Sequence, residues 1–455
     1  MTDANLPKLQ AFLHDHSTIQ SVVPSAPEYR DIRATYVSVP DVIPSIIVRP
    51  RTVEDAVAVV SFLIDNHIEF TVRGGGHDML GRAFKHQTVG VDVRLINYVD
   101  VEHDSRTARV GGGILIGDLI RKLHERGLAT AVGTVSAVGY VGWALYGGYG
   151  PYSARFGLGV DQILKAKVIN SQGRLEEADA DLLKGIRGAG GAFGVVVEVT
   201  VPVHKVDRIL AGVVFFESED LPAVIRQFND GYRALSGGMP AALSVNQAVV
   251  NTPQGRSFLI LLVWGSSDLE AGREWVDAIS RLAPVVSTTV KETTPPDWLA
   301  EADRLVPKTT QGRAYTINVK GLTEEVVQVM ASHLSRMPSE PQTMWNVHEL
   351  RACSPSAQPK SDSVFTSREG HFMFEILPLA ERREDLGSVL AWGRAFHEAL
   401  LMTDPGNILP ATYLSLSAPD EVDMSRVFGE HYEFLRELKG RRDPEGVFRN
   451  ALAWF

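Results

Sequence analysis

The spacing of apolar residues predicts a chain built from both helices and strands. After Thr52, an apolar residue recurs every three or four positions, at Val53, Val57, Val60 and Ile64. This periodicity predicts a helix over residues 52–67 that is capped by the Thr52 side chain and buries one apolar face. Period-two alternation over residues 195–203 instead predicts a strand.

The same two periodicities predict the remaining elements. Further strands are expected at residues 69–72, 89–101, 107–110, 163–170, 211–216, 258–264, 344–348 and 372–377. Further helices are expected at residues 117–126, 221–235, 268–282, 323–336 and 422–439. Between residues 208 and 405 this mixture favours an α+β lobe in which one face of a sheet covers a ligand.

Three glycine-rich segments interrupt the pattern. The first reads Thr-Val-Arg-Gly-Gly-Gly-His-Asp-Met-Leu-Gly over residues 71–81. Its three consecutive glycines lack Cβ atoms, so their backbone N–H groups can converge on an anion beside the cation of Arg73. The second segment, residues 133–161, is too rich in glycine for a regular helix or strand and suits a chain winding along a flat ligand. The third segment covers residues 187–194.

Composition and charge narrow the class of protein. A chain of 455 residues is too long for one core, which predicts two domains or lobes. The net charge of -10, without a long basic run, argues against a nucleic-acid partner. The N-terminus is polar and no apolar run approaches membrane-spanning length. Cys353 is the single cysteine, so no intramolecular disulfide can form, and a cytoplasmic protein is expected.

The glycine segments resemble those of FAD-linked oxidases of the PCMH-type FAD-binding family, which includes berberine bridge enzyme-like and 6-hydroxy-D-nicotine oxidase-like proteins. Residues 73–77 match the family's Arg-x-Gly-Gly-His loop, whose histidine is bonded to the flavin 8α-methyl group. The resemblance implies FAD held by one covalent link, through His77, because Val135 stands where bicovalent relatives carry a cysteine. Trp143 stands where many relatives have a histidine, and its indole either stacks in the site or packs in the core.

The resemblance also implies the fold and the cofactor contacts. It implies an α+β protein with a PCMH-type (vanillyl-alcohol-oxidase-like) FAD-binding domain over residues 1–207 and a substrate-binding α/β lobe with an antiparallel sheet over residues 208–405. A C-terminal segment, residues 406–455, would return to the FAD domain. No metal site is expected. The implied cofactor-binding residues are Arg73, Gly74, Gly75, Gly76, His77, Asp78, Gly81, Gly133, Ser136, Gly139, Gly142, Trp143, Gly148, Tyr149, Gly150, Leu158, Asp161, Gly194, Val195 and Val197.

Three candidates for a catalytic base lie in the second half of the chain. The first candidate is His348, because strand alternation puts Met344, Asn346 and His348 on one face. Glu375 lies among apolar residues, where burial would raise its pKa toward neutrality, unless it faces solvent at a sheet edge. Tyr413 has the most motif support, because residues 412–416 align with a strand that relatives carry at the active site.

The implied activity is that of a flavin-dependent oxidoreductase, with an oxidase as the favoured form. A substrate C–H next to nitrogen or oxygen would lose a hydride to the flavin, and O2 would then become H2O2. Aromatic residues at positions 140, 143, 146, 149 and 152 predict a flat or apolar small substrate, of the secondary-metabolite type, rather than a sugar. Two alternatives stay open: a flavin-scaffolded cyclisation without net oxidation, and dehydrogenation with an acceptor other than O2. The sequence does not set the oligomeric state.

Overall fold

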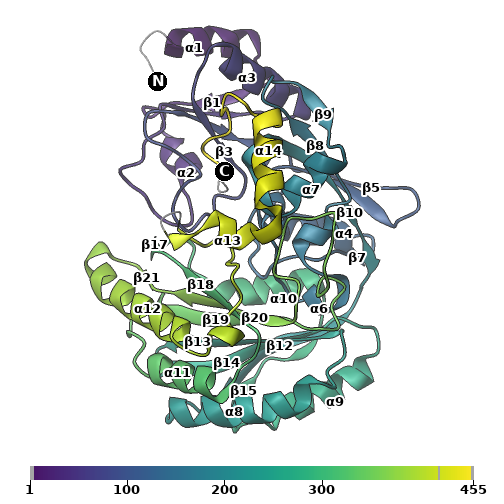
Figure 1. Ribbon diagram of the computed structural model, residues 1–455, viewed down its shortest axis with the longest axis vertical. Coiled ribbons are helices and arrows are strands. Elements are labelled where there is room, and N and C mark those ends of the chain that lie inside the picture. Colours follow the sequence, from purple (N-terminus) through teal and green to yellow (C-terminus); the bar gives the residue numbers. More distant parts are fainter. Residues whose placement is uncertain (1–4, 419–420, 452–454) are drawn as a thin grey trace.

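The N-terminal half of the protein contains two larger sheets (Figure 1). The computed structural model describes residues 5–418, 421–451 and 455. The four strands of the first sheet lie in the order β1 (Gln20–Val22), β2 (Ile46–Arg49), β4 (Val89–Asp92) and β3 (Phe70–Arg73). Strands β2, β4 and β3 run parallel. The antiparallel second sheet has the order β5 (Val99–Val101), β6 (Thr107–Gly111), β10 (Val195–Pro202), β8 (Lys165–Ile169) and β9 (Leu175–Glu177).

Helices surround these two sheets. They are α1 (Asn5–Asp15), α2 (Tyr29–Arg33), α3 (Val53–Asp65), α4 (Ile116–His124), α5 (Tyr140–Leu145), α6 (Ser153–Phe156) and α7 (Ala180–Ala189). The prediction that Thr52 caps α3 is confirmed, because its side chain and that of Asp55 form a reciprocal capping box. The buried face is rotated from the predicted one: Ala56, Val59 and Leu63 are buried, whereas Val57 is only partly so.

The second half forms one eight-stranded antiparallel sheet. Its main order is β15 (Val285–Thr288), β12 (Ile209–Phe216), β14 (Gly255–Trp264), β13 (Leu243–Thr252), β19 (Met344–Leu350), β20 (His371–Leu377) and β18 (Tyr315–Val319), with β16 (Lys291–Thr293) also paired to β12. Short pairs join β7 (Leu128–Ala129) to β11 (His204–Lys205) and β17 (Gln311–Gly312) to β21 (Leu379–Ala380). The helices of this half are α8 (Leu221–Ser236), α9 (Leu269–Ser280), α10 (Pro295–Ala302), α11 (Glu324–Leu334) and α12 (Leu386–Leu401).

The large sheet has two chemically different faces. Side chains such as Val249, Trp345 and Phe374 point into a core shared with α8, α11 and α12. Their neighbours one position away in each strand point to the opposite face, toward the N-terminal half. That second face carries the predicted trio of Met344, Asn346 and His348, so the predicted alternation of this strand is confirmed.

Three local predictions are wrong. Residues 133–161 contain two short helices, α5 and α6, because most of the glycines flank these helices and only Gly142 lies within α5. Residues 412–416 form a turn instead of a strand, with the Leu416 N–H donating to the Tyr413 carbonyl at 3.0 Å. The helix predicted over residues 422–439 is split into α13 (Met424–Phe428) and α14 (Tyr432–Arg442), because Gly429 adopts a φ of 48°.

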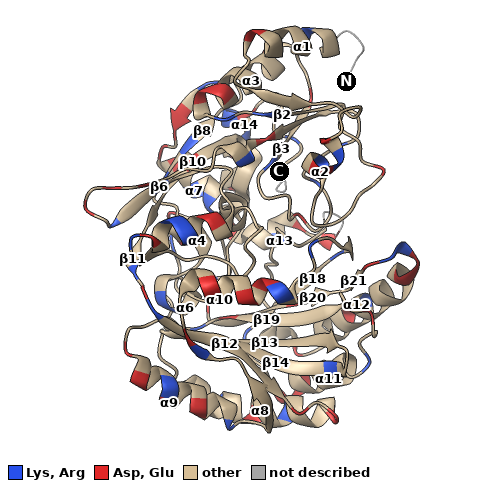
Figure 2. Cartoon of the chain, turned by 180° about the vertical axis from the view of Figure 1, so that it is seen from behind, with Lys and Arg blue, Asp and Glu red and all other residues tan. Residues whose placement is uncertain are grey.

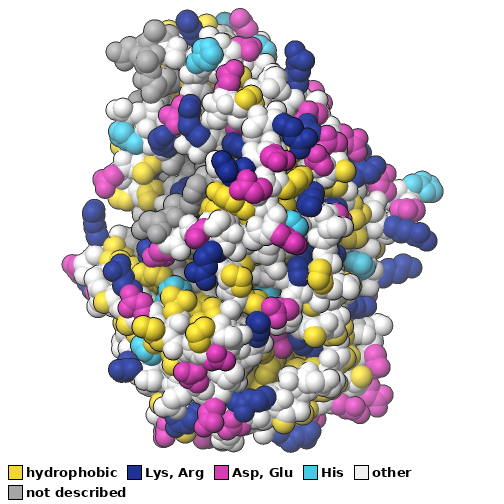
Figure 3. Space-filling model, in the orientation of Figure 1, with side chains coloured by type: hydrophobic (Ala, Val, Ile, Leu, Met, Phe, Trp, Pro, Cys, Tyr) yellow, Lys and Arg dark blue, Asp and Glu magenta, His cyan; other side chains and the backbone are white. Residues whose placement is uncertain are grey.

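The surface carries charges of both signs. Acidic and basic residues both occur on α9, whereas the charged residues of α10 are acidic (Figure 2). Charged side chains of both signs are interspersed over the face in Figure 3, with hydrophobic side chains between them. In the part of the chain that the structure describes, no helix has the length and apolar character needed to cross a membrane.

Candidate active site

A cavity of about 440 Å³ lies between the N-terminal half and the inner face of the large sheet. This volume is within the usual range for ligand sites. Its walls come from the first glycine segment, from the loop and helix around residues 133–149, from strands β13, β14, β19 and β20, and from residues 413–416. The cavity therefore brings together the first two glycine-rich segments, which the sequence predicts near the cofactor, and the residues around 344–348, 375 and 413, which it predicts near the substrate.

Two glycine loops meet at one end of the cavity. An added Cβ on Gly75 would lie 2.1 Å from the Gly139 nitrogen, and one on Gly139 would lie 2.4 Å from the Gly75 nitrogen. Only residues without side chains allow backbones to approach so closely. Among the described residues, the N–H groups of Gly75, Gly76 and His77 have no hydrogen-bond acceptor. This end of the cavity therefore presents unpaired donors that suit a phosphate.

The Arg73 side chain connects the first glycine loop to residues 32–34. Its buried guanidinium donates to the carbonyl oxygens of Ile32 and Ala34, the latter at 2.6 Å. Burial lowers the pKa of Arg73 to about 10, so the group stays protonated at neutral pH. A carboxylate oxygen of Asp92 lies 3.9 Å away. The cation thus ties the loop to residues 32–34 while it also lines the cavity.

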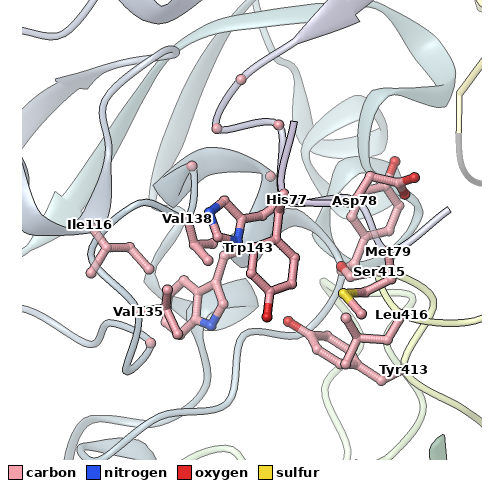
Figure 4. Close-up of a pocket in the computed structure, with 18 of the residues that line it drawn as sticks. His77, Asp78, Met79, Ile116, Val135, Val138, Trp143, Tyr413, Ser415 and Leu416 are labelled. Atoms are coloured by element: carbon pink, nitrogen blue, oxygen red, sulfur yellow. The ribbon is translucent and has the colours of Figure 1, made fainter. Parts of the chain in front are cut away.

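His77 projects into the middle of the cavity (Figure 4). Its imidazole stacks on the ring of Tyr36, with ring centroids 4.6 Å apart and planes inclined by 14°. Burial, helped by the charge of Arg73, lowers the pKa of His77 to about 4. The imidazole is therefore neutral near pH 7 and has a nitrogen lone pair available.

The predicted aromatic residues divide between cavity and core. Trp143, Tyr146 and Tyr149 line the cavity, whereas Tyr140 and Tyr152 are buried elsewhere in the core. Trp143 packs in the core and also lines the cavity. Its indole N–H donates to the Tyr149 carbonyl at 3.0 Å, which fixes the ring.

A polar cluster stands on the sheet face of the cavity. The Asn346 amide donates to the Glu375 carboxylate at 3.0 Å, and His348 Nε2 lies 3.5 Å from the other carboxylate oxygen. The amide of Asn246, on β13, lies 3.0 Å from His348 Nδ1. The surrounding wall is apolar, with Ala248, Val250, Leu259, Leu261 and Leu377.

The prediction of a raised Glu375 pKa is wrong. Burial alone would raise it, but the charge of His348 and the hydrogen bonds from His348 and Asn346 together outweigh burial, and the pKa of Glu375 lies below its ordinary value. The carboxylate is therefore ionised at neutral pH. Nor does Glu375 face solvent at an edge, because β20 lies between β19 and β18.

Tyr413 and Tyr149 bring two phenols to the same end of the cavity. Their rings meet edge to face with centroids 5.5 Å apart. Burial, together with the charge of Glu375, raises the pKa of Tyr413, so its hydroxyl keeps its proton. The His371 Nδ1 lies 2.8 Å from the Glu369 carbonyl, which can only accept, so Nε2 of the neutral ring must accept the Tyr149 hydroxyl at 2.6 Å.

The cavity gathers most of the residues predicted for the site. All three base candidates line it, as do the predicted cofactor residues Arg73, Gly74, Gly75, Gly76, His77, Asp78, Gly133, Gly139, Gly142, Trp143, Tyr149, Gly194 and Val195. The other predicted cofactor residues lie outside its lining, namely Gly81, Ser136, Gly148, Gly150, Leu158, Asp161 and Val197.

Several of these outlying residues have structural partners instead. The Ser136 N–H and hydroxyl both donate to the Asp303 carboxylate, the former at 2.9 Å, which connects this loop to the end of α10. Gly150 lies against the Val132 carbonyl, at a distance where a Cβ cannot fit. Leu158 is fully buried in the core. These contacts shape the wall of the cavity from outside it.

Asp161 forms a buried ion pair with Arg368, at 2.6 Å. We expect Asp161→Asn to lower the free energy of unfolding by about 3 kcal/mol, because Arg368 would keep a buried charge without its partner. Bound flavin per folded chain should stay unchanged. Denaturant unfolding measures the first quantity and the visible spectrum the second. Asp362→Asn is a matched control, since Asp362 pairs with Arg187 but is 68% exposed. This substitution should lower the free energy of unfolding by less than about 1 kcal/mol. Loss of flavin at unchanged stability would contradict this assignment.

Three residues of the site were not predicted from the sequence. Tyr36 comes from an irregular segment, Asn246 from a strand that the periodicity did not reveal, and His371 acts through Tyr149 from outside the cavity. Recognition of β13 by its alternation would have pointed to Asn246, because residues 246, 248 and 250 share the cavity face.

Comparison with known proteins agrees with this geometry. Residues 44–179 match the FAD binding domain family. The FAD-linked oxidoreductase aurO of Gibberella zeae is 28% identical over 429 residues, which cover 93% of this chain and 83% of the relative. The structure of 6-hydroxy-D-nicotine oxidase from Arthrobacter nicotinovorans matches with a TM-score of 0.82 at 22% identity, over 95% of this chain and 97% of that one. Glucooligosaccharide oxidase from Acremonium strictum, described with a 6-S-cysteinyl, 8α-N1-histidyl FAD, matches with a TM-score of 0.82 at 18% identity, over 96% and 97% of the two chains.

The fold and the site together define an FAD-dependent oxidoreductase. The chain has the PCMH-type fold of berberine bridge enzyme-like proteins, and residues 44–179 are its match to the FAD binding domain. The predicted fold class and the predicted enzyme class are both confirmed. The unpaired N–H donors of the glycine loop and the adjoining ring-lined space fit the phosphates and the flat ring of this cofactor.

Proposed function

We propose that this protein is an FAD-dependent oxidase of a small, largely apolar or aromatic molecule, of the kind found in secondary metabolism. One observation carries the proposal: a single cavity connects a cradle of unpaired backbone N–H groups with an apolar sheet face that bears one polar cluster. The cradle suits the cofactor phosphates, and the sheet face suits a substrate held beside the flavin ring. O2 is the proposed acceptor, and it would leave as H2O2.

The proposed cofactor is FAD bonded through His77 alone. The neutral imidazole of His77 supports this, because only an unprotonated nitrogen can form a bond to carbon. A second link through cysteine lacks a residue: Val135 lines the cavity where the relatives' cysteine would align, and Cys353 is exposed. The histidyl FAD named for the glucooligosaccharide oxidase is a further reason for the proposal.

His77→Ala should separate covalent attachment from cofactor binding. We expect the wild-type protein to keep its yellow colour in the pellet after acid precipitation, and the variant to release at least nine-tenths of its flavin to the supernatant. The variant should still bind FAD before precipitation, because the glycine N–H groups that hold the phosphates remain. The visible spectrum of pellet and supernatant measures both quantities. Wild-type flavin that moves to the supernatant would contradict the proposed link.

Bound FAD supplies the redox chemistry by accepting a hydride. The chain's own groups handle the substrate proton. Glu375 is ionised and paired with His348, so this pair can take the proton of a substrate O–H or N–H. Tyr413 keeps its proton and can donate a hydrogen bond to the substrate heteroatom. The apolar wall of β13 and β14 would exclude water from the reacting carbon.

The same wall supports the proposed substrate class. Apart from the polar cluster, the inner sheet face offers mostly aliphatic side chains, whereas a sugar needs many placed polar groups. The phenols of Tyr149 and Tyr413 add aromatic surface at one end. C–N or C–O oxidation, dehydrogenation and oxidative cyclisation of a flat molecule are all compatible with this arrangement.

A substrate panel with two readouts tests the proposal. Phenolic polyketides, alkaloid-type amines and oligosaccharides would be incubated with the yellow protein, and flavin bleaching without oxygen and H2O2 release in air would be recorded. We expect bleaching and peroxide with an aromatic compound. Peroxide only with oligosaccharides would overturn the substrate class. Substrate conversion without bleaching would favour the non-oxidative cyclase, and bleaching with slow reoxidation in air would favour a dehydrogenase that uses another acceptor.

A further inference from the structure

The imidazole of His77 is held by one directional contact. Among the described residues, neither of its nitrogens has a hydrogen-bond partner, and the stack on Tyr36 is its one recorded ring contact. The torsion that turns an imidazole about its Cβ–Cγ bond is broad, so the ring plane is poorly fixed by the His77 backbone. The Tyr36 ring is therefore the group that selects this plane.

Tyr36 is itself fixed from two sides. Its N–H donates to the Gly76 carbonyl at 2.9 Å, and its carbonyl accepts the Thr310 N–H at 2.9 Å. Tyr36 is 8% exposed, and its side chain packs with Met79 and Leu377. The phenol thus forms a rigid wall between the glycine loop and the substrate-side half of the chain.

We propose that Tyr36 is a positioning residue for covalent attachment of the flavin to His77. This inference rests on the histidyl link proposed above. In the attachment, a C–N bond forms between an imidazole nitrogen and the flavin 8α-methyl carbon, and one methyl C–H bond breaks and releases a proton. The two electrons of that bond reduce the flavin ring, and O2 reoxidises it to give H2O2. The imidazole nitrogen must point at the methyl carbon for this bond to form, and the stack on Tyr36 sets that direction.

The ring of Tyr36, and not its hydroxyl, is the acting group in this inference. Stacking needs a flat face, which phenylalanine keeps and leucine lacks. Without the stack the imidazole can turn away from the direction of attack, and misalignment of reacting groups commonly costs one to two orders of magnitude in rate. Binding of FAD should persist, because the phosphate cradle uses backbone N–H groups outside the Tyr36 side chain.

The test follows covalent attachment over time. Full-length apoprotein from riboflavin-starved cells would be mixed with saturating FAD, and acid-stable flavin would be measured at intervals. We expect Tyr36→Phe to match the wild type, and Tyr36→Leu and Tyr36→Met to attach flavin 10- to 100-fold more slowly while binding FAD non-covalently. Tyr29→Leu is the matched control, because Tyr29 is also buried, at 7% exposure, near the same segment but does not line the cavity; it should attach flavin at the wild-type rate.

Each other result overturns the inference in a recognisable way. Attachment at the wild-type rate in both Tyr36→Leu and Tyr36→Met would leave the histidyl link intact but remove Tyr36 from it. A Tyr36→Phe protein as slow as Tyr36→Leu would assign the effect to the hydroxyl. Loss of non-covalent FAD binding in both aliphatic variants would show that Tyr36 supports the whole site. No acid-stable flavin in the wild type would instead refute the covalent link of the proposed function, and the role of Tyr36 with it.

Discussion

Gly75→Ala should deprive the protein of most of its flavin. The added Cβ would lie 2.1 Å from the Gly139 nitrogen and 2.9 Å from the Ala137 carbonyl oxygen, and both are backbone atoms that cannot turn aside. The two loops would have to separate, at a typical cost of about 1–3 kcal/mol for overpacking. Their separation would also disperse the N–H groups of residues 75–77. We expect the flavin-to-protein ratio after desalting to fall below about one-tenth of the wild-type value.

Gly74→Ala provides the matched control for this prediction. An added Cβ on Gly74 meets nothing within 4 Å, and Gly74 does not have a positive φ. This neighbour should therefore keep nearly full flavin, measured by the visible spectrum, and both variants should retain the circular dichroism of the folded chain. Equal flavin loss in the two variants would mean that general disturbance of the loop, rather than the contact with Gly139, governs binding. Full flavin in Gly75→Ala would mean that the loops can separate freely.

The contrast between Gly74 and Gly75 shows why the cofactor-binding residues could be predicted from the sequence. A close approach of two backbones requires glycine, so it can be recognised from the sequence. Gly75 and Gly139 are such glycines, although they are far apart in the chain. The glycine segments therefore pointed to residues that do line one cavity, and the resemblance they carry predicted the fold correctly.

The substrate side was less accessible because it depends on pairing between distant strands. Alternation correctly put Asn346 and His348 on one face, but Asn246 joins them only through the register of β13 with β19. The sequence likewise shows the apolar neighbours of Glu375 but not the two groups that stabilise its charge. For the same reason Asp161 matched a cofactor motif, while its ion-pair partner Arg368 lies 207 positions away.

These contacts also separate the two tasks of the cavity. Backbone donors and the stacked His77 serve one end, and they derive from the first glycine segment and the irregular segment around Tyr36. Side chains of four paired strands serve the other end. Variants of the two ends should therefore have separable effects, on flavin content in one case and on flavin reduction in the other. Flavin content can therefore serve as a control when a substitution at the sheet end slows flavin reduction.

Glu375→Gln should slow flavin reduction by substrate by a factor of about 10²–10⁴, the usual contribution of a positioned base. Glutamine keeps the size of the side chain but cannot accept a proton, and flavin content should not change. The measurement is the rate of anaerobic flavin bleaching with the compound that reduces the wild type in the panel. Glu349→Gln is the matched control, because Glu349 is similarly buried, at 12% side-chain exposure against 16% for Glu375, but lies outside the cavity lining.

The pH dependence of the wild type distinguishes this electrostatic arrangement from the one expected of an isolated buried carboxyl. Since the pKa of Glu375 lies below its ordinary value of 4.5, the carboxylate stays charged from there upward. The loss of rate that is due to Glu375 should therefore begin only as the pH falls below about 4.5, and it should be absent in Glu375→Gln. A raised pKa would instead reduce the rate between pH 7 and pH 5. A Glu375→Gln protein that bleaches within threefold of the wild-type rate would remove the Glu375 carboxylate from the proton-transfer step.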